Sequence, residues 1–231
     1  VERREAMLKP HLAPTQASTF QVNGIRNFIR TRRAELDQPQ YNEDLFPTSD
    51  VLDVQITLEE NDWNTIRHQS RNFFSALSPQ RKSGPVEGPY TYVKAKVKIG
   101  EIEFPEVGLR KKGFLGSQNS ERPSLKIKLN HVNDQSEING LSMLTFNNNQ
   151  QDISLMSQAV GYAMYNAAGS PAPRCGYARI TVNGKNLGVY SHVETLDRTF
   201  LRREFGDDRG PLYEGTAVDF FKGREKDFEN K

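Results

Sequence analysis

Short runs in which apolar and polar residues alternate are the feature that most constrains the fold of this chain. In residues 91–99, valine, alanine and isoleucine fall on one side and lysine on the other, and residues 125–129 repeat the pattern with leucine and isoleucine. Residues 51–58 alternate as well. A period of two sends successive side chains to opposite faces of a strand. The sequence therefore predicts an antiparallel sheet with an apolar back and a basic front.

Residues 107–129 concentrate positive charge around a glycine-rich turn. Arg110 and Lys112 lie on the face of the first strand opposite to that of Leu109. On the second strand, Lys126 lies between Leu125 and Ile127, which point to the other face. The turn between them contains Gly113, Gly116 and Ser117. Glycine permits close backbone approach, and turn amides can donate to phosphate oxygens. This strand, turn and strand is therefore predicted to hold an anion.

Helices and a hairpin complete an α+β pattern. A short helix is expected from residue 59 to His68, and a core-packed helix from an N-cap at Asp152 to Gly169. Asn183-Gly184 between two alternating runs predicts a β-hairpin. After it, a helix is expected to begin at a Thr195 cap and to end at Gly206, so that Glu194 stands at a strand-to-helix junction.

Composition excludes several classes of function. The chain has 231 residues, with 31 Lys and Arg against 29 Asp and Glu, so no overall field marks it as a nucleic-acid binder. No apolar run reaches the roughly 18 residues that a membrane-spanning helix needs. The single Cys175 excludes an intrachain disulfide and multi-cysteine zinc sites. The four histidines lack the spacing of metal ligands, so no metal site is expected.

The ordered series of motifs resembles the spore coat protein H (CotH) family of atypical protein kinases. The series runs through Gly108-Leu-Arg-Lys-Lys-Gly113, Ser124-Leu-Lys-Ile-Lys128, the segment from Asp152 to Gly169, Val182-Asn-Gly184, Gly188-Val-Tyr190 and Val193-Glu-Thr-Leu-Asp197. The resemblance covers residues 45–231, and each motif alone is weak. It implies a protein-kinase-like fold, mostly the β-rich N-terminal lobe with the hinge and the start of the helical lobe.

This resemblance also implies a function, namely the transfer of phosphate from ATP to a protein substrate with Mg or Mn. Lys126 is then the first candidate for the lysine that steadies the phosphates, followed by Arg110 and Lys112. Residues 193–197 resemble the hinge, where Glu194 and Asp197 would orient the segment or touch the ribose. The expected nucleotide-binding set is Arg110, Lys112, Gly113, Gly116, Ser117, Lys126, Glu194 and Asp197.

Two departures from the family pattern limit this expectation. The metal-binding and proton-accepting residues of the family are expected downstream of Lys231, so residues 45–231 are expected to be an incomplete kinase domain that is inactive alone. The helix from Asp152 carries no acid in its body that could pair with a lysine. Residues 1–40, with a basic helix at 27–36, are expected to be a helical segment and linker, and they resemble the tail of a preceding domain of the same kind.

Two other classes of function stay open. The first is a non-catalytic module of a spore coat or cell surface with a kinase-like scaffold, since fold does not fix function. The second is a polyanion-binding module that uses Lys94, Lys96, Lys98, Lys126 and Lys128. Relatives of this type imply a coat, cell-surface or other extracytoplasmic address. The sequence alone does not identify the phosphoacceptor or the oligomeric state.

Overall fold

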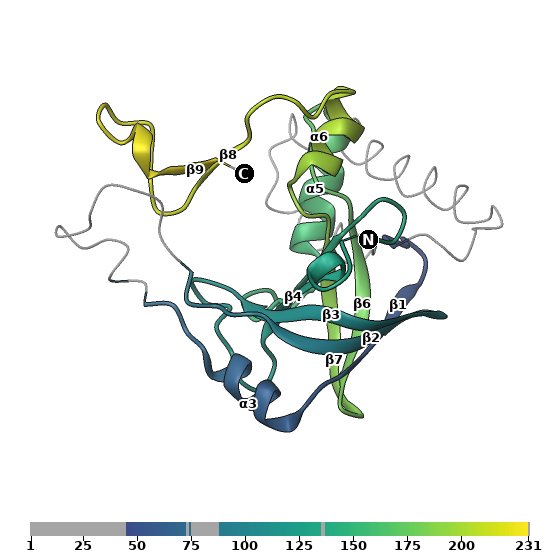
Figure 1. The fold of residues 1–231 in the computed structure, drawn as a ribbon. Helices are drawn as coiled ribbons and strands as arrows, with labels where there is room; N and C mark the ends of the chain where they lie inside the picture. Colours follow the sequence, from purple (N-terminus) through teal and green to yellow (C-terminus); the bar gives the residue numbers. More distant parts are fainter. Residues whose placement is uncertain (1–44, 73, 75–87, 135–136, 231) are drawn as a thin grey trace, which may run out of the picture. The chain divides into compact units, whose positions relative to one another are not determined.

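The computed structural model describes residues 45–72, 74, 88–134 and 137–230. The expected helix at 27–36 and the rest of the segment 1–40 lie outside the described residues, as does most of the loop expected at 78–89. Within the described residues the chain is α+β, with a large sheet and few helices (Figure 1). This confirms the predicted class, although the sheet dominates.

Seven strands close into a barrel. Around it the order is β1 (Val51–Thr57), β2 (Val93–Ile99), β3 (Ile102–Lys112), β4 (Ser124–Lys128), β5 (Met143–Asn147), β7 (Lys185–Val193) and β6 (Cys175–Val182). All neighbours are antiparallel except β1 and β6, which run parallel and close the barrel. Closure pairs every one of these strands on both sides.

The apolar side of each predicted strand forms the interior of this barrel. Val54, Val97, Ile127, Leu144 and Ile180 are fully buried there. They come from five different strands and belong to one continuous core. The predicted alternation is therefore confirmed. The expected apolar back is the inner surface of a closed sheet, because the sheet packs on itself instead of on a covering layer.

Glutamates balance the lysine side of β2. Each of its three outward lysines forms an ion pair with a glutamate of β3 or of the turn before it. The pairs are Lys94–Glu106 at 2.7 Å, Lys96–Glu103 at 3.0 Å and Lys98–Glu101 at 3.2 Å. The continuous basic front expected from the sequence is thus interrupted, because the neighbouring strand supplies the opposite charge.

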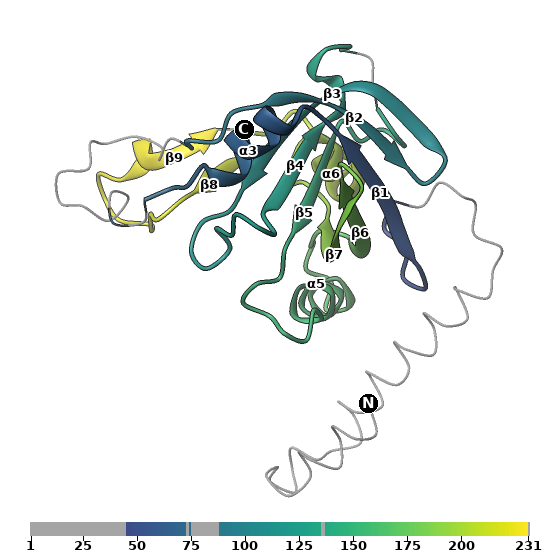
Figure 2. The same ribbon diagram turned by 90° about the horizontal axis from the view of Figure 1, so that it is seen from below.

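In the part of the chain that the structure describes, three α-helices lie outside the barrel. Helix α3 (Glu60–His68) buries Trp63 and Ile66 and confirms the first predicted helix. Helix α5 (Ser157–Ala167) lies beside β6, and α6 (Arg198–Phe205) follows β7 (Figure 2). Two short 3₁₀ helices, η2 (Leu129–His131) and η3 (Glu225–Asp227), and a small hairpin of β8 (Tyr213–Gly215) with β9 (Phe228–Asn230) complete the described elements.

The prediction for the central helix was wrong in its start and in its burial. Helix α5 begins at Ser157, and none of its residues is buried, whereas a core-packed helix from Asp152 was expected. Leu155 takes a left-handed φ of 59°, which interrupts a helix at that point. The Asp152 carboxylate instead accepts hydrogen bonds from the Ser154 and Ser157 amides. The Ser154 hydroxyl also donates to this carboxylate, and that bond, together with the bond from the Ser157 amide, lowers the pKa of Asp152 to about 2.

The two predictions around the hairpin came out differently. Asn183 and Gly184 occupy the β6–β7 turn with φ of 47° and 80°, which confirms the hairpin. Helix α6 ends at Gly206 as predicted. Its N-cap, however, is Asp197 and not Thr195, because the Asp197 carboxylate accepts hydrogen bonds from the amides of the first helical turn.

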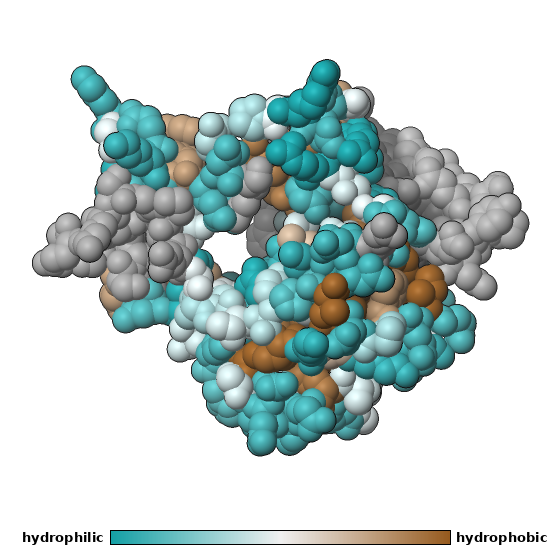
Figure 3. Space-filling view, viewed as in Figure 1, coloured by the Kyte–Doolittle hydropathy of each residue, from teal (hydrophilic) through white to brown (hydrophobic). Residues whose placement is uncertain are grey.

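The face of the molecule drawn in Figure 3 is mainly hydrophilic over the described residues, with separate apolar patches.

Candidate functional site

Three cationic side chains gather on the outer face of β3 and β4. Arg110 is the direct cross-strand partner of Lys126, and Lys112 is the next outward residue along β3. All three side chains are half-buried. Lys111, between Arg110 and Lys112, points to the opposite side, where its Nζ donates to the Arg67 carbonyl at 2.7 Å. The period of two therefore brings together the three cations that the sequence singled out.

Lys112 is held in place within the cation cluster, by which we mean Arg110, Lys112 and Lys126. Its Nζ donates to the Asn147 side-chain oxygen of β5 at 2.6 Å. Burial lowers the pKa of Lys112 to about 8, and the charges of Lys126 and Arg110 add to the effect while Glu214 of β8 opposes it. An anion bound beside Lys112 would offset the neighbouring positive charges and favour its charged form.

The turn after β3 is preformed by contacts within itself. The Phe114 amide donates to Ser117 Oγ at 3.1 Å, and the Tyr90 hydroxyl donates to the Gly113 carbonyl at 2.6 Å. Gly113 has a φ of 131°, and a Cβ there would lie 2.8 Å from Ser117 Oγ. Gly116 also has a positive φ, of 67°. Glycine is therefore required by the shape of the turn, independently of any ligand.

Asn148 anchors the following loop. Only 2% of this residue is exposed, and its Nδ2 donates to the Ser117 carbonyl at 3.1 Å and to the Arg122 carbonyl at 2.8 Å. Arg122 in turn donates from Nε to the Leu187 carbonyl of β7 at 2.8 Å. The turn next to the cation cluster is thus fixed to β5 and β7 by buried side-chain hydrogen bonds.

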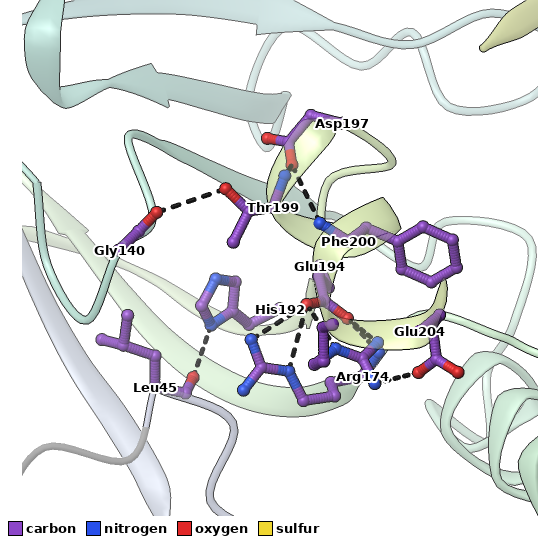
Figure 4. Close-up of polar contacts among 10 residues, drawn as sticks. Leu45, Gly140, Arg174, His192, Glu194, Asp197, Thr199, Phe200 and Glu204 are labelled. Atoms are coloured by element: carbon purple, nitrogen blue, oxygen red, sulfur yellow. Dashed lines mark hydrogen bonds and ion pairs between the residues drawn. The ribbon is translucent and has the colours of Figure 1, made fainter. Parts of the chain in front are cut away.

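The junction after β7 is held by a buried carboxylate. Arg174 approaches the Glu194 carboxylate at 2.9 Å, and Arg203 of α6 donates to it at 3.1 Å (Figure 4). Burial alone would raise the pKa of Glu194, but the hydrogen bonds from Arg203 and Arg174 outweigh this and lower it. The Asp197 carboxylate caps the N-terminus of α6. In this arrangement both acids orient the junction.

One hydroxyl contact links this junction to the cation cluster. Thr195 Oγ1 lies 3.0 Å from Thr145 Oγ1 of β5. Thr145 is the cross-strand neighbour of Lys126 on β4. The junction and the cationic face are therefore connected through β5, a strand from which the sequence had singled out no functional residue.

The structure thus divides the predicted nucleotide-binding set in two. Arg110, Lys112 and Lys126 lie together, and the turn with Gly113, Gly116 and Ser117 joins the same two strands. Glu194 and Asp197 lie beyond β7 with their carboxylates engaged by the protein. Sequence reasoning missed Asn147 and Asn148. The run of three asparagines at 147–149 was the signal that could have located them.

Within the described residues, the histidines do not form a ligand set. His192 is completely buried and contacts the Leu45 carbonyl through Nδ1 at 2.7 Å, whereas His68 is exposed. Among the residues that the structure describes, no group of three or more His, Cys, Asp or Glu could hold a metal ion. The helices of the described part include none that is long and apolar enough to cross a membrane.

Comparison with known proteins gives one family. Residues 109–231 match the family model described as CotH kinase protein. The match begins in β3 at Leu109, so it includes the cation cluster, the glycine turn and the Glu194 junction. No curated protein matches the chain. The family resemblance expected from the sequence is confirmed.

Proposed function

Because this chain belongs to the CotH kinase protein family, we propose that residues 45–231 bind ATP as part of a protein kinase of this type. The single observation that carries the proposal is the cation cluster beside a preformed glycine turn. In this proposal the barrel corresponds to the β-rich lobe of a kinase-like fold, and residues 194–197 correspond to the hinge before the helical lobe.

The cations would supply the electrostatic part of the reaction. Phosphoryl transfer asks a protein mainly to position the phosphates and to offset their charge. Lys126 and Arg110 face each other across β3 and β4, and Lys112 adds a third positive charge one step along the strand. We place the phosphates against these three side chains, with the Gly113 to Ser117 turn as one border of the site.

The junction residues would have an orienting role. Glu194 and Asp197 hold the segment between β7 and α6, so the backbone of residues 194–197 is the part left to meet the adenine. The contact between Thr195 and Thr145 places that segment next to the strand that flanks Lys126. Burial of the Glu194 carboxylate supports this assignment and disfavours a direct contact with the ribose.

The metal and the substrate belong to the proposal only in outline. Mg or Mn would accompany ATP, but the described residues do not include a fitting set of acidic ligands, so no step of the reaction is derived through the metal. A protein is the proposed substrate, and a spore coat or cell surface the proposed location. The polyanion alternative depended on five lysines, and the ion pairs on β2 offset the charge of three of them.

Calorimetric titration of the chain with ATP, with and without Mg or Mn, tests the proposal. Lys126→Ala should weaken binding by about tenfold or more, since a hydrogen bond to a charged group contributes about 1.5–3 kcal/mol. Lys94→Ala is the matched control, because it removes an equal charge from β2, and it should bind like the wild type. Equal affinity in both variants would remove the cation cluster from the site. No binding by the wild-type chain would favour the non-catalytic structural module.

A further inference from the structure

Two neutral amides connect Lys112 to helix α5. Lys112 Nζ donates to Asn147 Oδ1 at 2.6 Å, and Asn147 Nδ2 donates to Gln158 Oε1 at 2.9 Å. The three residues come from β3, β5 and the first turn of α5. Each of the three residues is half-buried. The result is a directional chain of hydrogen bonds that starts at the amine and ends on the helix.

The chemistry of this chain suits a lysine that must stay available to an anion. A carboxylate in the place of Asn147 would raise the pKa of the amine and neutralise its charge locally. An amide oxygen accepts the hydrogen bond from the amine and carries no net charge. An ammonium has three donors, so one bond to Asn147 fixes its position and leaves further donors for a ligand.

Helix α5 has few other ways to fix its position. None of its residues is buried, and Val160, Met164 and Tyr165 are exposed. The bond from Asn147 to Gln158 is thus one of the specific contacts that hold its first turn to the barrel. A second one lies just upstream, where the Tyr177 hydroxyl donates to the Leu155 carbonyl at 2.8 Å. A displacement of α5 would therefore be transmitted to the Lys112 amine through a single side chain.

We propose that Asn147 and Gln158 are positioning residues, which hold the Lys112 amine through an uncharged relay and couple its position to that of α5. A carboxylate on the helix would hold the Lys112 amine through an ion pair. The relay holds the same amine through neutral amides, and the charge of the cation cluster is therefore not offset. Its benefit for nucleotide binding rests on the proposed function, but the relay itself is a property of the protein without ligand.

Acetylation of Lys112 by acetic anhydride in the ligand-free chain, followed by peptide mass spectrometry from pH 6 to 10, tests the relay directly. Asn147→Asp should slow the reaction near neutral pH by about tenfold, because a rise of one pKa unit lowers the neutral amine tenfold. Gln158→Ala should change the rate by about threefold or more, because it frees the Asn147 side chain. Gln158→Glu keeps the acceptor but adds a negative charge to the relay, so it should slow the reaction near neutral pH as Asn147→Asp does. Exposed Gln150→Ala is the matched control. Identical profiles in wild type, Asn147→Asp and Gln158→Ala would overturn the relay.

ATP titration of the same variants separates this inference from the proposed function. Weaker ATP binding by Gln158→Ala, beside unchanged binding by the control Gln150→Ala, would support the coupling of α5 to the site. Unchanged ATP affinity in Gln158→Ala, beside a wild type that binds, would overturn that coupling. If the variants change the acetylation profile but the wild-type chain binds no ATP, the relay is supported and only the proposed function is contradicted.

Discussion

At the scale of single residues, His192 shows how the core sets the chemistry of a side chain. Its ring stacks on Phe46 at 4.4 Å and on Phe146 at 4.7 Å between ring centres. Nδ1 donates to the Leu45 carbonyl, and no protein group among the described residues pairs with the buried Nε2. Burial lowers the pKa of His192 to about 4, so the residue is neutral in the folded protein at neutral pH.

This burial predicts a loss of stability in mild acid. The folded-state pKa of about 4 lies below the ordinary 6.5, so the unfolded chain binds the proton first as the pH falls. The free energy of unfolding should therefore decrease as the pH falls from 6.5 towards 4, by about 2–3 kcal/mol from this residue. Urea unfolding at pH 7, 6 and 5 measures it. His192→Phe should flatten the dependence above pH 5, whereas His68→Gln, which removes an exposed histidine, should keep the wild-type slope. Equal slopes in all three proteins would contradict the prediction.

At the scale of elements, the turn after β3 combines a backbone that requires glycine with a place beside the proposed ATP site. Gly113 needs its φ of 131°, and a methyl group there would collide with the Ser117 side chain that the Phe114 amide binds. Gly184, in the β6–β7 hairpin, also has a positive φ, but its surroundings are open. The two glycines therefore differ in what a substitution would disturb.

Gly113→Ala should lower both stability and ATP affinity, while Gly184→Ala should lower stability alone. Each alanine costs about 1–2 kcal/mol through its positive φ. Only the first also displaces Ser117 and the border of the cation cluster. Urea unfolding gives the stability, and calorimetry with ATP gives the affinity. Equal ATP affinity in the two variants at comparable stability would show that the turn takes no part in the site.

The elements also show what the sequence can predict. Period two located β1, β2 and β4, and Asn183-Gly184 located the β6–β7 hairpin, because these signals arise from a few adjacent residues. The period of two did not indicate β5, for which no strand was predicted. Helix α5 was misplaced because the turn at Asp152 and the left-handed Leu155 lie within a stretch whose apolar spacing is helical. The cations of the site were predictable from their strands. The relay through Asn147 was not, since an asparagine after a strand is equally typical of a loop.

At the scale of the whole described molecule, the closure of the barrel depends on residues far apart in the chain. Residues 51–56 of β1 pair in parallel with residues 177–182 of β6, and β1 pairs with β2 on its other side. Alternation indicates which side chains face the core, but it carries no information on which distant strand lies alongside. For this reason the sequence predicted the faces of the sheet and not its closure.

Closure makes β1 a strand without a free edge, and this can be tested with one substitution. The side chain of Gln55 points outward and is exposed, so Gln55→Pro alters mainly the backbone. Proline removes the amide of a strand that pairs on both sides, which should cost about 3 kcal/mol or more in the free energy of unfolding. Gln55→Ala, the matched control, should change it by only about 0.5 kcal/mol. If β1 were an edge strand instead, every second amide of residues 51–57 would lack a strand partner and would exchange fast. Slow exchange in the wild type, together with a large loss of stability in Gln55→Pro alone, is the result that the closed barrel requires.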